Sequence, residues 1–392
     1  MIYLFIVIFS FSLVLLNAIC RKSKTVCIAN SYCLFLLFLL LVCVMGLRYR
    51  VGLDTLNYME RYSQVPLLAD FSWEYFFEGN YEFLYVLLVN ISRAFSDSFF
   101  SFQFLQTVIV NIVIFRFAIK YSANTYLYIF LYIMMGYLYF NTEILRESIA
   151  ICCFILSWKY LQNGNYKKYY AWIAIALLGH YSASFCLFLP FIKKMRLETN
   201  FLFVLSGVLL ISILGVALLV NNIDWLVPIL PKNLLGKIYG YFVNDYGGFG
   251  VMGILFGFVF NVCTPLILVY LSNKRSVIRN REIEPFMCLY IIVSVLGVFF
   301  VIFSRFNNYL LPIYILYLCN FIGERRGCFK RQSILNIVFT GWVLLAFIYP
   351  YLKSTEDVAS GTHFYNGWVP YHSVFDPLQV PERERLWRNW DF

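Results

Sequence analysis

Two arginines and an aspartate lie close together in the segment 47–58, directly after a long apolar run. The guanidinium groups of Arg48 and Arg50 keep their charge at any physiological pH, and they bind phosphate oxygens in a bidentate fork. Asp54 can accept the proton of an attacking hydroxyl group. The segment is therefore a candidate anion site. A pair of interfacial arginines with Asp54 as their ion-pair partner fits the local pattern equally well.

A second group of charges opens the apolar run that follows residue 143. Arg146 lies between Glu143 and Glu147, at spacings that allow an ion pair within one helix. The helix dipole disfavours a cation at an N-terminus, however. An anion held between Arg146 and the first N–H groups of the helix would remove this conflict. Arg146 is therefore a second candidate anion ligand, beside the simpler interpretation of a charged helix start.

Two further polar positions interrupt apolar sequence. His180 follows Gly179 inside a long apolar run. A lone histidine of this kind is more often a satisfied core residue than a catalyst, although its ordinary pKa permits acid or base catalysis near neutral pH. Arg305 lies in the segment 304–309. That segment predicts a break between two apolar helices, which is either a plain turn or the place of a further cation.

The composition restricts the elements that position these residues. Of 392 residues, 61% are hydrophobic and 13% are charged, and the net charge is +10. Soluble domains carry roughly 25% charged residues, so the composition excludes an ordinary soluble enzyme and a disordered protein. The eleven cysteines form no CxxC pair and lie mostly in apolar runs, where a thiol packs as a small hydrophobe. We therefore expect an all-α fold, a polytopic bundle of transmembrane helices.

A helix needs about 20 apolar residues to cross a bilayer, and the bundle predicted here has about 10–12 spans. Two apolar segments are ambiguous. The run 82–95 is short for a span, and 169–192 either crosses once or enters and returns around Gly179 and His180. The clearer candidate spans are 1–19, 26–47, 101–119, 123–141, 144–161, 200–220, 250–271, 285–304, 307–322 and 333–351.

Clusters of basic residues predict the orientation, because Lys and Arg collect in cytoplasmic loops. One arrangement places every cluster in the cytoplasm. In it the N-terminus starts outside, 82–95 lies on the outer surface as an interfacial helix, and 169–192 enters and returns. In the rival arrangement both segments cross once, which moves two basic clusters outside. The first arrangement fits the distribution of charge better.

The favoured arrangement predicts a single transmembrane catalytic domain, residues 1–352, and an extracytoplasmic tail, residues 353–392. The predicted outer loops are 48–100 and 221–249, and the tryptophans of the tail are expected at the level of the lipid headgroups. An outer face that collects several ionisable groups suits an anionic lipid headgroup, most simply a phosphate or pyrophosphate. The groups on this face are Arg48, Arg50, Asp54, Arg146, His180 and Arg305.

The segment 47–58 resembles the Arg-x-x-Val-Gly-x-Asp-x-x-x-Tyr signature of the EpsG family, a branch of the Wzy-like polysaccharide polymerases. Further landmarks of that family follow in order. They are Glu82 before an apolar run, Leu145-Arg146 with Ile149-Ala150, the Gly179–Ala183 stretch, and Arg305 with Tyr309. Thr55 stands where the family often has tyrosine, and Glu147 follows Arg146. Both positions are places where substrate choice could differ.

The resemblance implies a polymerase in the bacterial inner membrane that joins oligosaccharide repeat units carried on undecaprenyl pyrophosphate. The product would be O-antigen, capsule or exopolysaccharide. The partners would be the lipid-linked donor and acceptor, membrane lipids and a polysaccharide chain-length regulator, and no nucleic acid. Because the sequence has no nucleotide-binding loop and no metal-ligand motif, neither a cofactor nor a metal is expected.

The resemblance also suggests roles for single residues. Asp54 or His180 would act as the general base, with a preference for Asp54, and Glu82 would position Asp54 or an acceptor sugar. Tyr58 and Tyr309 would contact the pyrophosphate or the sugar. The predicted ligands of the pyrophosphate, which stabilise its charge as it leaves, are Arg48, Arg50, Arg146 and Arg305.

Other classes of protein share parts of this pattern. A flippase for the same lipid-linked unit also needs an outward basic cavity, but the weak internal repeat of many transporters is missing from the sequence. An O-antigen ligase uses similar chemistry, so local residues do not separate it from a polymerase. A membrane assembly subunit without catalysis is the remaining alternative.

Overall fold

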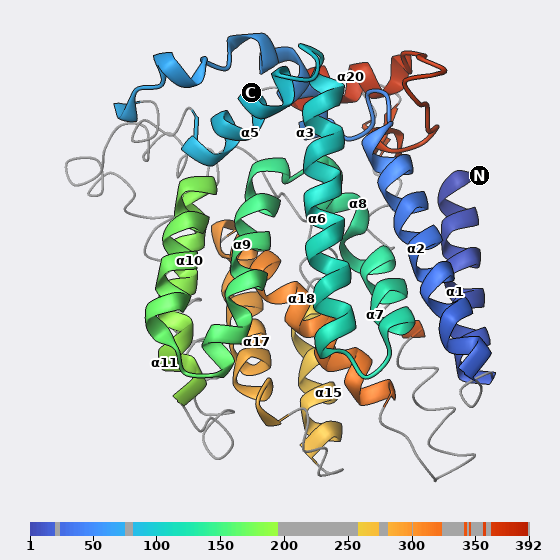
Figure 1. The fold of residues 1–392 in the computed structure, drawn as a ribbon, viewed down its shortest axis with the longest axis vertical. Coiled ribbons are helices and arrows are strands. Elements are labelled where there is room, and N and C mark those ends of the chain that lie inside the picture. The colour runs from blue at the N-terminus through green and yellow to red at the C-terminus, as the bar shows by residue number, and fades with distance from the viewer. Residues whose placement is uncertain are drawn as a thin grey trace. The chain divides into compact units, whose positions relative to one another are not determined.

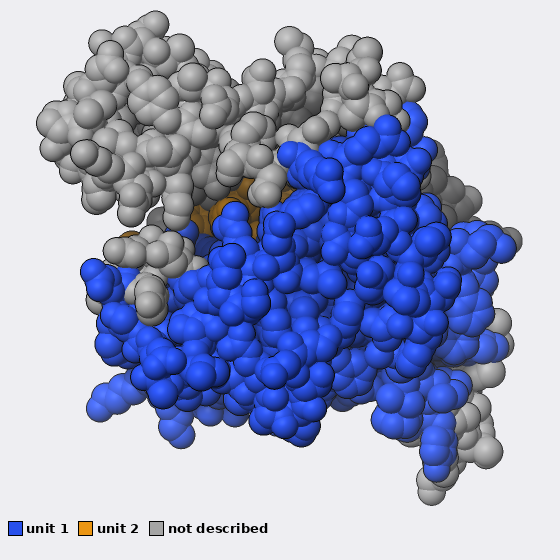
Figure 2. Space-filling view, turned by 90° about the horizontal axis from the view of Figure 1, so that it is seen from above, with its two compact units in different colours: residues 1–183, 325–392 blue, residues 184–324 orange. Residues whose placement is uncertain are grey.

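A computed structural model of the chain describes two compact units, coloured separately in Figure 2. The first unit comprises residues 1–183 and 325–392, and the second comprises residues 184–324. The described residues are 1–19, 24–74, 81–194, 258–273, 281–299, 301–323, 341–342, 345, 356–357 and 362–390.

The first unit is mostly helical, with two short strands in its C-terminal part (Figure 1). The strands β1 (Glu356–Asp357) and β2 (Thr362–His363) pair antiparallel. A π-helical turn, Ile133–Tyr137, joins α7 to α8. The helices are α1 (Ile2–Ile19), α2 (Lys24–Gly46), α3 (Leu53–Arg61), α5 (Phe83–Arg93), α6 (Phe99–Tyr121), α7 (Thr125–Tyr132), α8 (Leu138–Thr142), α9 (Leu145–Gln162), α10 (Tyr166–Gly179) and α20 (Pro381–Trp390).

The second unit is also helical in its described part, so the expected all-α character is confirmed there as well. A 3₁₀ segment, Tyr181–Phe188, leads from the first unit into the second. The helices are α11 (Leu189–Lys194), α15 (Thr264–Asn273), α17 (Glu284–Phe299) and α18 (Val301–Gly323), and a π-helical turn, Val259–Cys263, precedes α15.

One described helix, α6, is both long and apolar enough to cross a membrane. Its 23 residues span about 35 Å, somewhat more than the hydrocarbon thickness of a bilayer. Several shorter apolar helices accompany it, among them α2 and α17. The multi-span bundle therefore stays a prediction. The expected span 200–220, the loop 221–249 and the domain boundary at 352/353 lie outside the described residues.

The two ambiguous apolar segments have distinct structures. Helix α5 has 11 residues and is about 16 Å long, too short to cross, as expected for 82–95. Its buried side chains, such as Tyr85 and Val89, pack in one cluster with Phe102 of α6. The run 169–192 breaks where the sequence predicts, because α10 ends at Gly179 and His180 is extended. The expectation that this run enters the membrane and returns stays a prediction.

The predicted break at 304–309 is wrong, because α18 is continuous from Val301 to Gly323. Helix α17 ends at Phe299 and α18 begins at Val301, before the predicted break. The polar residues that indicated a turn contact the neighbouring helix instead. The amide of Asn307 donates a hydrogen bond to the hydroxyl of Ser294 at 3.0 Å.

Arg48 is fully buried and closes the connection between α2 and α3. Its guanidinium donates hydrogen bonds to the carbonyls of Met45 and Val51 and to the hydroxyl of Thr55. The side-chain amide of Gln103, on α6, donates to the carbonyl of Arg48 at 2.9 Å. Burial lowers the pKa of Arg48 to about 10, so the group stays charged at neutral pH. Arg48 therefore organises the backbone at this turn.

Glu143, between α8 and α9, caps the N-terminus of α3. Its carboxylate accepts the backbone N–H of Leu53 at 3.2 Å and that of Asp54 at 3.0 Å. Gly52 precedes the helix with φ 97°, a left-handed conformation that favours glycine. A Cβ at Gly52 would lie 2.5 Å from Cβ of Thr142. The start of α3 is thus fitted closely against the α8–α9 junction.

The C-terminal segment folds back onto the same connection, at the end of α2 and α6 where α3 also lies (Figure 1). Backbone hydrogen bonds join Tyr49 to His372 and Gly52 to Gly367, at 2.8 and 2.9 Å. Trp368 donates its indole N–H to Thr142. Trp368 and Trp387 are buried within this unit, and their expected place at the level of the headgroups stays a prediction.

The crowding at Gly52 predicts that a substitution there lowers stability more than the same substitution at Gly164, a second glycine with a left-handed backbone. Gly164 has φ 71°, and a Cβ added to it would meet nothing within 4 Å. We expect Gly164→Ala to cost about 1 kcal/mol of unfolding free energy through backbone strain alone. Gly52→Ala should cost roughly 1–3 kcal/mol more, because of overpacking against Thr142. Unfolding of the purified variants in detergent measures the difference, and equal costs would contradict this packing.

The capping carboxylate predicts a pH dependence of stability. Burial, with a smaller contribution from the charge of Asp54, raises the pKa of Glu143 from 4.5 to about 7. Its contribution to stability is therefore fully present below pH 4.5 and is lost as the pH rises through about 7. We expect thermal unfolding in detergent to show this decline. Glu143→Gln should remove it, whereas Glu60→Gln, at an exposed position of α3, should leave it unchanged.

Candidate active site

A buried ion pair between Glu82 and Arg146 lies at the centre of the candidate site. Nη1 of Arg146 lies 2.6 Å from Oε2 of Glu82. The Glu82 side chain is 2% exposed and that of Arg146 is 26% exposed. Glu82 directly precedes α5, and Arg146 is in the first turn of α9. The buried carboxylate therefore holds an arginine side chain that is partly exposed to solvent.

Tyr58 and Tyr85 pack around the same guanidinium. Nε of Arg146 donates a hydrogen bond to the hydroxyl of Tyr58 at 3.1 Å. The guanidinium carbon lies 5.4 Å from the centroid of the Tyr58 ring and 5.8 Å from that of Tyr85, within the range of cation–π attraction. Burial raises the pKa of Tyr58, so its hydroxyl is a neutral acceptor at physiological pH. The two rings restrict the position of Arg146.

His180 approaches the second oxygen of the same carboxylate. Nε2 of His180 lies 3.9 Å from Oε1 of Glu82, and the imidazole is buried. Its Nδ1 accepts the backbone N–H of Ser182 at 3.2 Å and lies 2.6 Å from the Ser182 hydroxyl. A neutral imidazole whose Nδ1 accepts a backbone hydrogen bond carries its proton on Nε2. That proton faces Glu82.

Asp54 lies one helical turn before Tyr58 on α3, so the two side chains share one side of the helix. Asp54 is exposed. Its charge acts on Tyr58 and contributes to the raised pKa of that phenol, after the larger effect of burial. The structure thus brings Tyr58, Glu82, Arg146 and His180 into one cluster, with Asp54 at its exposed edge.

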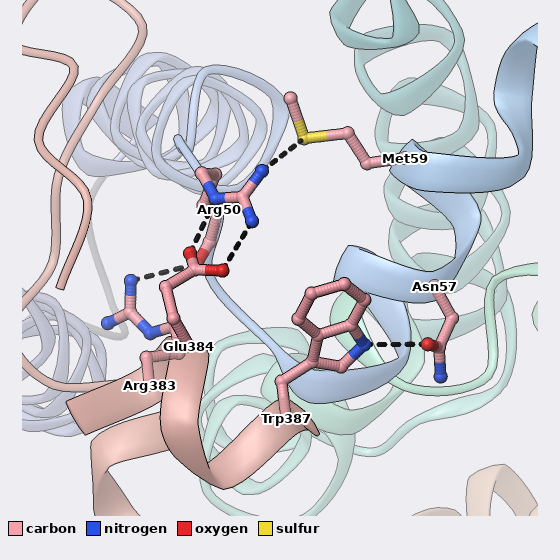
Figure 3. Close-up of polar contacts among 6 residues, drawn as sticks. All are labelled: Arg50, Asn57, Met59, Arg383, Glu384 and Trp387. Carbon is pink, nitrogen blue, oxygen red and sulfur yellow. Dashed lines mark hydrogen bonds and ion pairs between the residues drawn. The ribbon is translucent and has the colours of Figure 1, made fainter. Parts of the chain in front are cut away.

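Arg50, predicted as a pyrophosphate ligand, is bound by a carboxylate of the chain itself. Nε and Nη2 of Arg50 each donate to one oxygen of Glu384 on α20, both at 2.6 Å (Figure 3). The side chains of Arg50 and Glu384 are 17% and 15% exposed. Arg48 donates to backbone and hydroxyl oxygens, as described above. At both arginines, the guanidinium donors that would bind a phosphate are therefore engaged by acceptors of the protein itself.

Arg305 and Tyr309 belong to α18 in the second unit. They are one helical turn apart and so lie on the same side of that helix. Tyr309 is buried and Arg305 is half-buried. Their predicted participation in the site stays a prediction.

Three contributors to this region were not predicted as site residues. Glu143 is notable in the sequence only as a neighbour of Arg146, yet it caps α3. Glu384 and Trp387 lie in the predicted extracytoplasmic tail, where no site residue was expected. The alternation of charges with Leu386 and Trp387 in Pro381–Trp390 is the signal that could have indicated an amphipathic helix packed on the protein.

Comparison with known families gives one match. Residues 31–373 match the EpsG family, which covers most of the chain, including α3, the Glu82–Arg146 pair, His180 and α18. Comparison with curated proteins and with solved structures gives no match. The extent of the family match, together with the clustering of the residues that carry its signature, identifies the chain as a member of the EpsG family of membrane-associated polysaccharide polymerases.

Proposed function

We propose that the chain joins oligosaccharide repeat units carried on undecaprenyl pyrophosphate, at the outer face of the bacterial inner membrane. The product is an O-antigen, capsular or exopolysaccharide chain. The observation that carries this proposal is the partly exposed side chain of Arg146, held by the buried carboxylate of Glu82 beside Tyr58 and His180. The proposal includes a multi-span membrane bundle and a chain-length regulator as partner.

The position of Arg146 favours an anionic ligand. It lies in the first turn of the 18-residue helix α9, whose N-cap residue Ile144 supplies no side-chain hydrogen bond. The dipole of α9 and the charge of Arg146 therefore both favour an anion near this helix start. Glu82 offsets part of the arginine's charge and fixes its direction. A pyrophosphate that gains charge as it leaves would be stabilised here without any rearrangement of the site.

The reaction itself needs a base and no nucleotide. The acceptor hydroxyl oxygen attacks the anomeric carbon of the donor sugar, and the bond from that carbon to the pyrophosphate oxygen breaks. The hydroxyl proton passes to Asp54, and undecaprenyl pyrophosphate leaves with the bonding electrons. Asp54 is the favoured base because it is exposed, on the same side of α3 as Tyr58.

His180 has a different role in this proposal. The imidazole is buried, and its two nitrogens face Ser182 and Glu82. Such a histidine acts through Glu82 and is a positioning residue. Arg305 of the second unit is proposed as a second phosphate ligand, and Tyr309 as a contact of the pyrophosphate or the sugar.

We expect Arg146→Lys to lower polymer formation at least about 100-fold, because an ammonium cannot replace the planar fork between Glu82, Tyr58 and a phosphate. A deletion strain complemented with each variant measures this as the loss of polysaccharide ladders. The protein should persist in the membrane, and single repeats should accumulate. Lys159→Arg, at an exposed position near the other end of α9, is the matched control.

Normal ladders with Arg146→Lys would remove Arg146 from the mechanism. The deletion strain also separates the alternatives. Loss of every surface repeat, including single ones, would indicate a flippase or a ligase.

The pH dependence of polymerisation by purified enzyme distinguishes the two candidate bases. Asp54→Asn should lower kcat about 10²–10⁴-fold and remove the acidic limb of the pH profile. His180→Gln should lower activity and keep that limb, because the base is intact. Loss of the acidic limb in His180→Gln, with the limb kept in Asp54→Asn, would exchange the two roles.

A further inference from the structure

The C-terminal helix α20 holds the signature segment through the side chain of Arg50. Both oxygens of Glu384 accept hydrogen bonds from Arg50, in a bidentate ion pair that is largely shielded from solvent (Figure 3). Hydrogen bonding to Glu384 raises the pKa of Arg50. In this ion pair, the two guanidinium donors that a bound phosphate would need are already occupied. Arg50 is therefore better suited to joining two segments than to binding substrate.

Arg383, next to Glu384, holds the backbone of the signature segment. It is fully buried, and its Nη1 donates to the carbonyl of Arg50 at 2.8 Å. Its Nε donates to the carbonyl of Asn366 at 3.0 Å. Arg50 has φ 51°, a left-handed conformation that is unfavourable for a residue with a side chain. The contacts from α20 thus stabilise an unusual backbone conformation shortly before α3 begins at Leu53.

Trp387 connects α20 with α3 directly. Its indole N–H donates to the side-chain oxygen of Asn57 at 2.6 Å (Figure 3). Trp387 and Leu386 also pack with Leu53 and Leu56 in a buried cluster. The three α3 residues in these contacts lie on one side of the helix, about 120° around its axis from the side that carries Asp54 and Tyr58. The tail therefore fixes the rotation of α3 without covering its reactive side.

We infer that α20 is a positioning element of the active site, acting through the Arg50–Glu384 pair and the Trp387–Asn57 hydrogen bond. By fixing α3, it sets the direction of Asp54 and keeps Tyr58 on the guanidinium of Arg146. Arg50, Glu384 and Trp387 are then positioning residues. This inference rests on the proposed function. It makes the C-terminal tail part of the active site, although the tail lies far from the signature segment in the sequence.

An exchange of charges tests the inference. We expect Arg50→Glu and Glu384→Arg each to lower kcat at least tenfold, because like charges separate α20 from α3. The double variant should recover to within about threefold of wild type, since the pair is restored in reverse. Recovery is the decisive result, because a glutamate at position 50 cannot bind pyrophosphate. Glu382→Gln, at the exposed side of the same helix, is the matched control and should leave kcat unchanged.

Two results would overturn the inference. One is wild-type kcat in both single variants. The other is a double variant as inactive as Arg50→Glu while Glu384→Arg alone is nearly normal, since Arg50 would then act on the substrate itself.

Milder variants keep the test decisive if the charge exchange prevents accumulation in the membrane. Glu384→Gln and Trp387→Phe keep the approximate shapes of the side chains and remove one charge and one hydrogen bond. We expect each to lower kcat about three- to tenfold with little change of KM, because the base is displaced while the phosphate ligand stays. An unchanged kcat in both would overturn the inference.

Trypsin cleavage after Arg383 measures tail docking independently of catalysis, because this arginine is fully buried in the folded protein. Cleavage should accelerate in Arg50→Glu and return to the wild-type rate in the double variant. If the wild-type protein makes no polymer from lipid-linked repeats while the cleavage pattern is as expected, the proposed function fails and the docking stands. If wild type polymerises and cleavage does not respond, the inference fails alone.

Discussion

The ion pair between Glu82 and Arg146 is the interaction on which the candidate site depends. A carboxylate that is 2% exposed loses nearly all its hydration, and this cost is offset only by a close partner and further hydrogen bonds. Arg146 supplies the charge, and Nε2 of His180 faces the other oxygen. Removing Arg146 would leave the carboxylate of Glu82 buried and uncompensated. Together with His180, the pair therefore brings three separate segments of the chain into one arrangement.

The arginines of the signature segment and its surroundings have different physical roles, although the sequence presents them alike. Arg48 organises the turn between α2 and α3 through backbone carbonyls. Arg50 joins α3 to the C-terminal helix through Glu384. Of these three, Arg146 has the most exposed side chain, at 26% against 17% for Arg50, and its partner Glu82 is buried. The exposure of an arginine side chain and the partner that it contacts depend on tertiary structure. These two properties distinguish an arginine that is a candidate for binding phosphate from one with a structural role.

Much of the fold follows from local patterns, because apolar runs determine helices such as α2, α6 and α9 almost to the residue. The break at Gly179 and His180 was one of two alternatives for the run 169–192, because that run is also long enough to cross once. The break predicted at 304–309 was not real, because the polarity of Asn307 serves a contact with α17. Polar residues indicate turns only when they face water, and the sequence alone does not reveal what they face.

The pairing of charges could not be predicted from the sequence in the same way. Glu143 and Glu147 are the near neighbours of Arg146, but the partner is Glu82, 64 residues earlier. Glu143 instead caps α3, where its carboxylate binds two backbone N–H groups that could otherwise have bound a phosphate. An anion site at one helix start is thus filled by the protein's own carboxylate, while the start of α9 carries a guanidinium and no side-chain cap. In a chain with 13% charged residues, this division of partners leaves Arg146 with a buried carboxylate as its partner and a side chain that is 26% exposed.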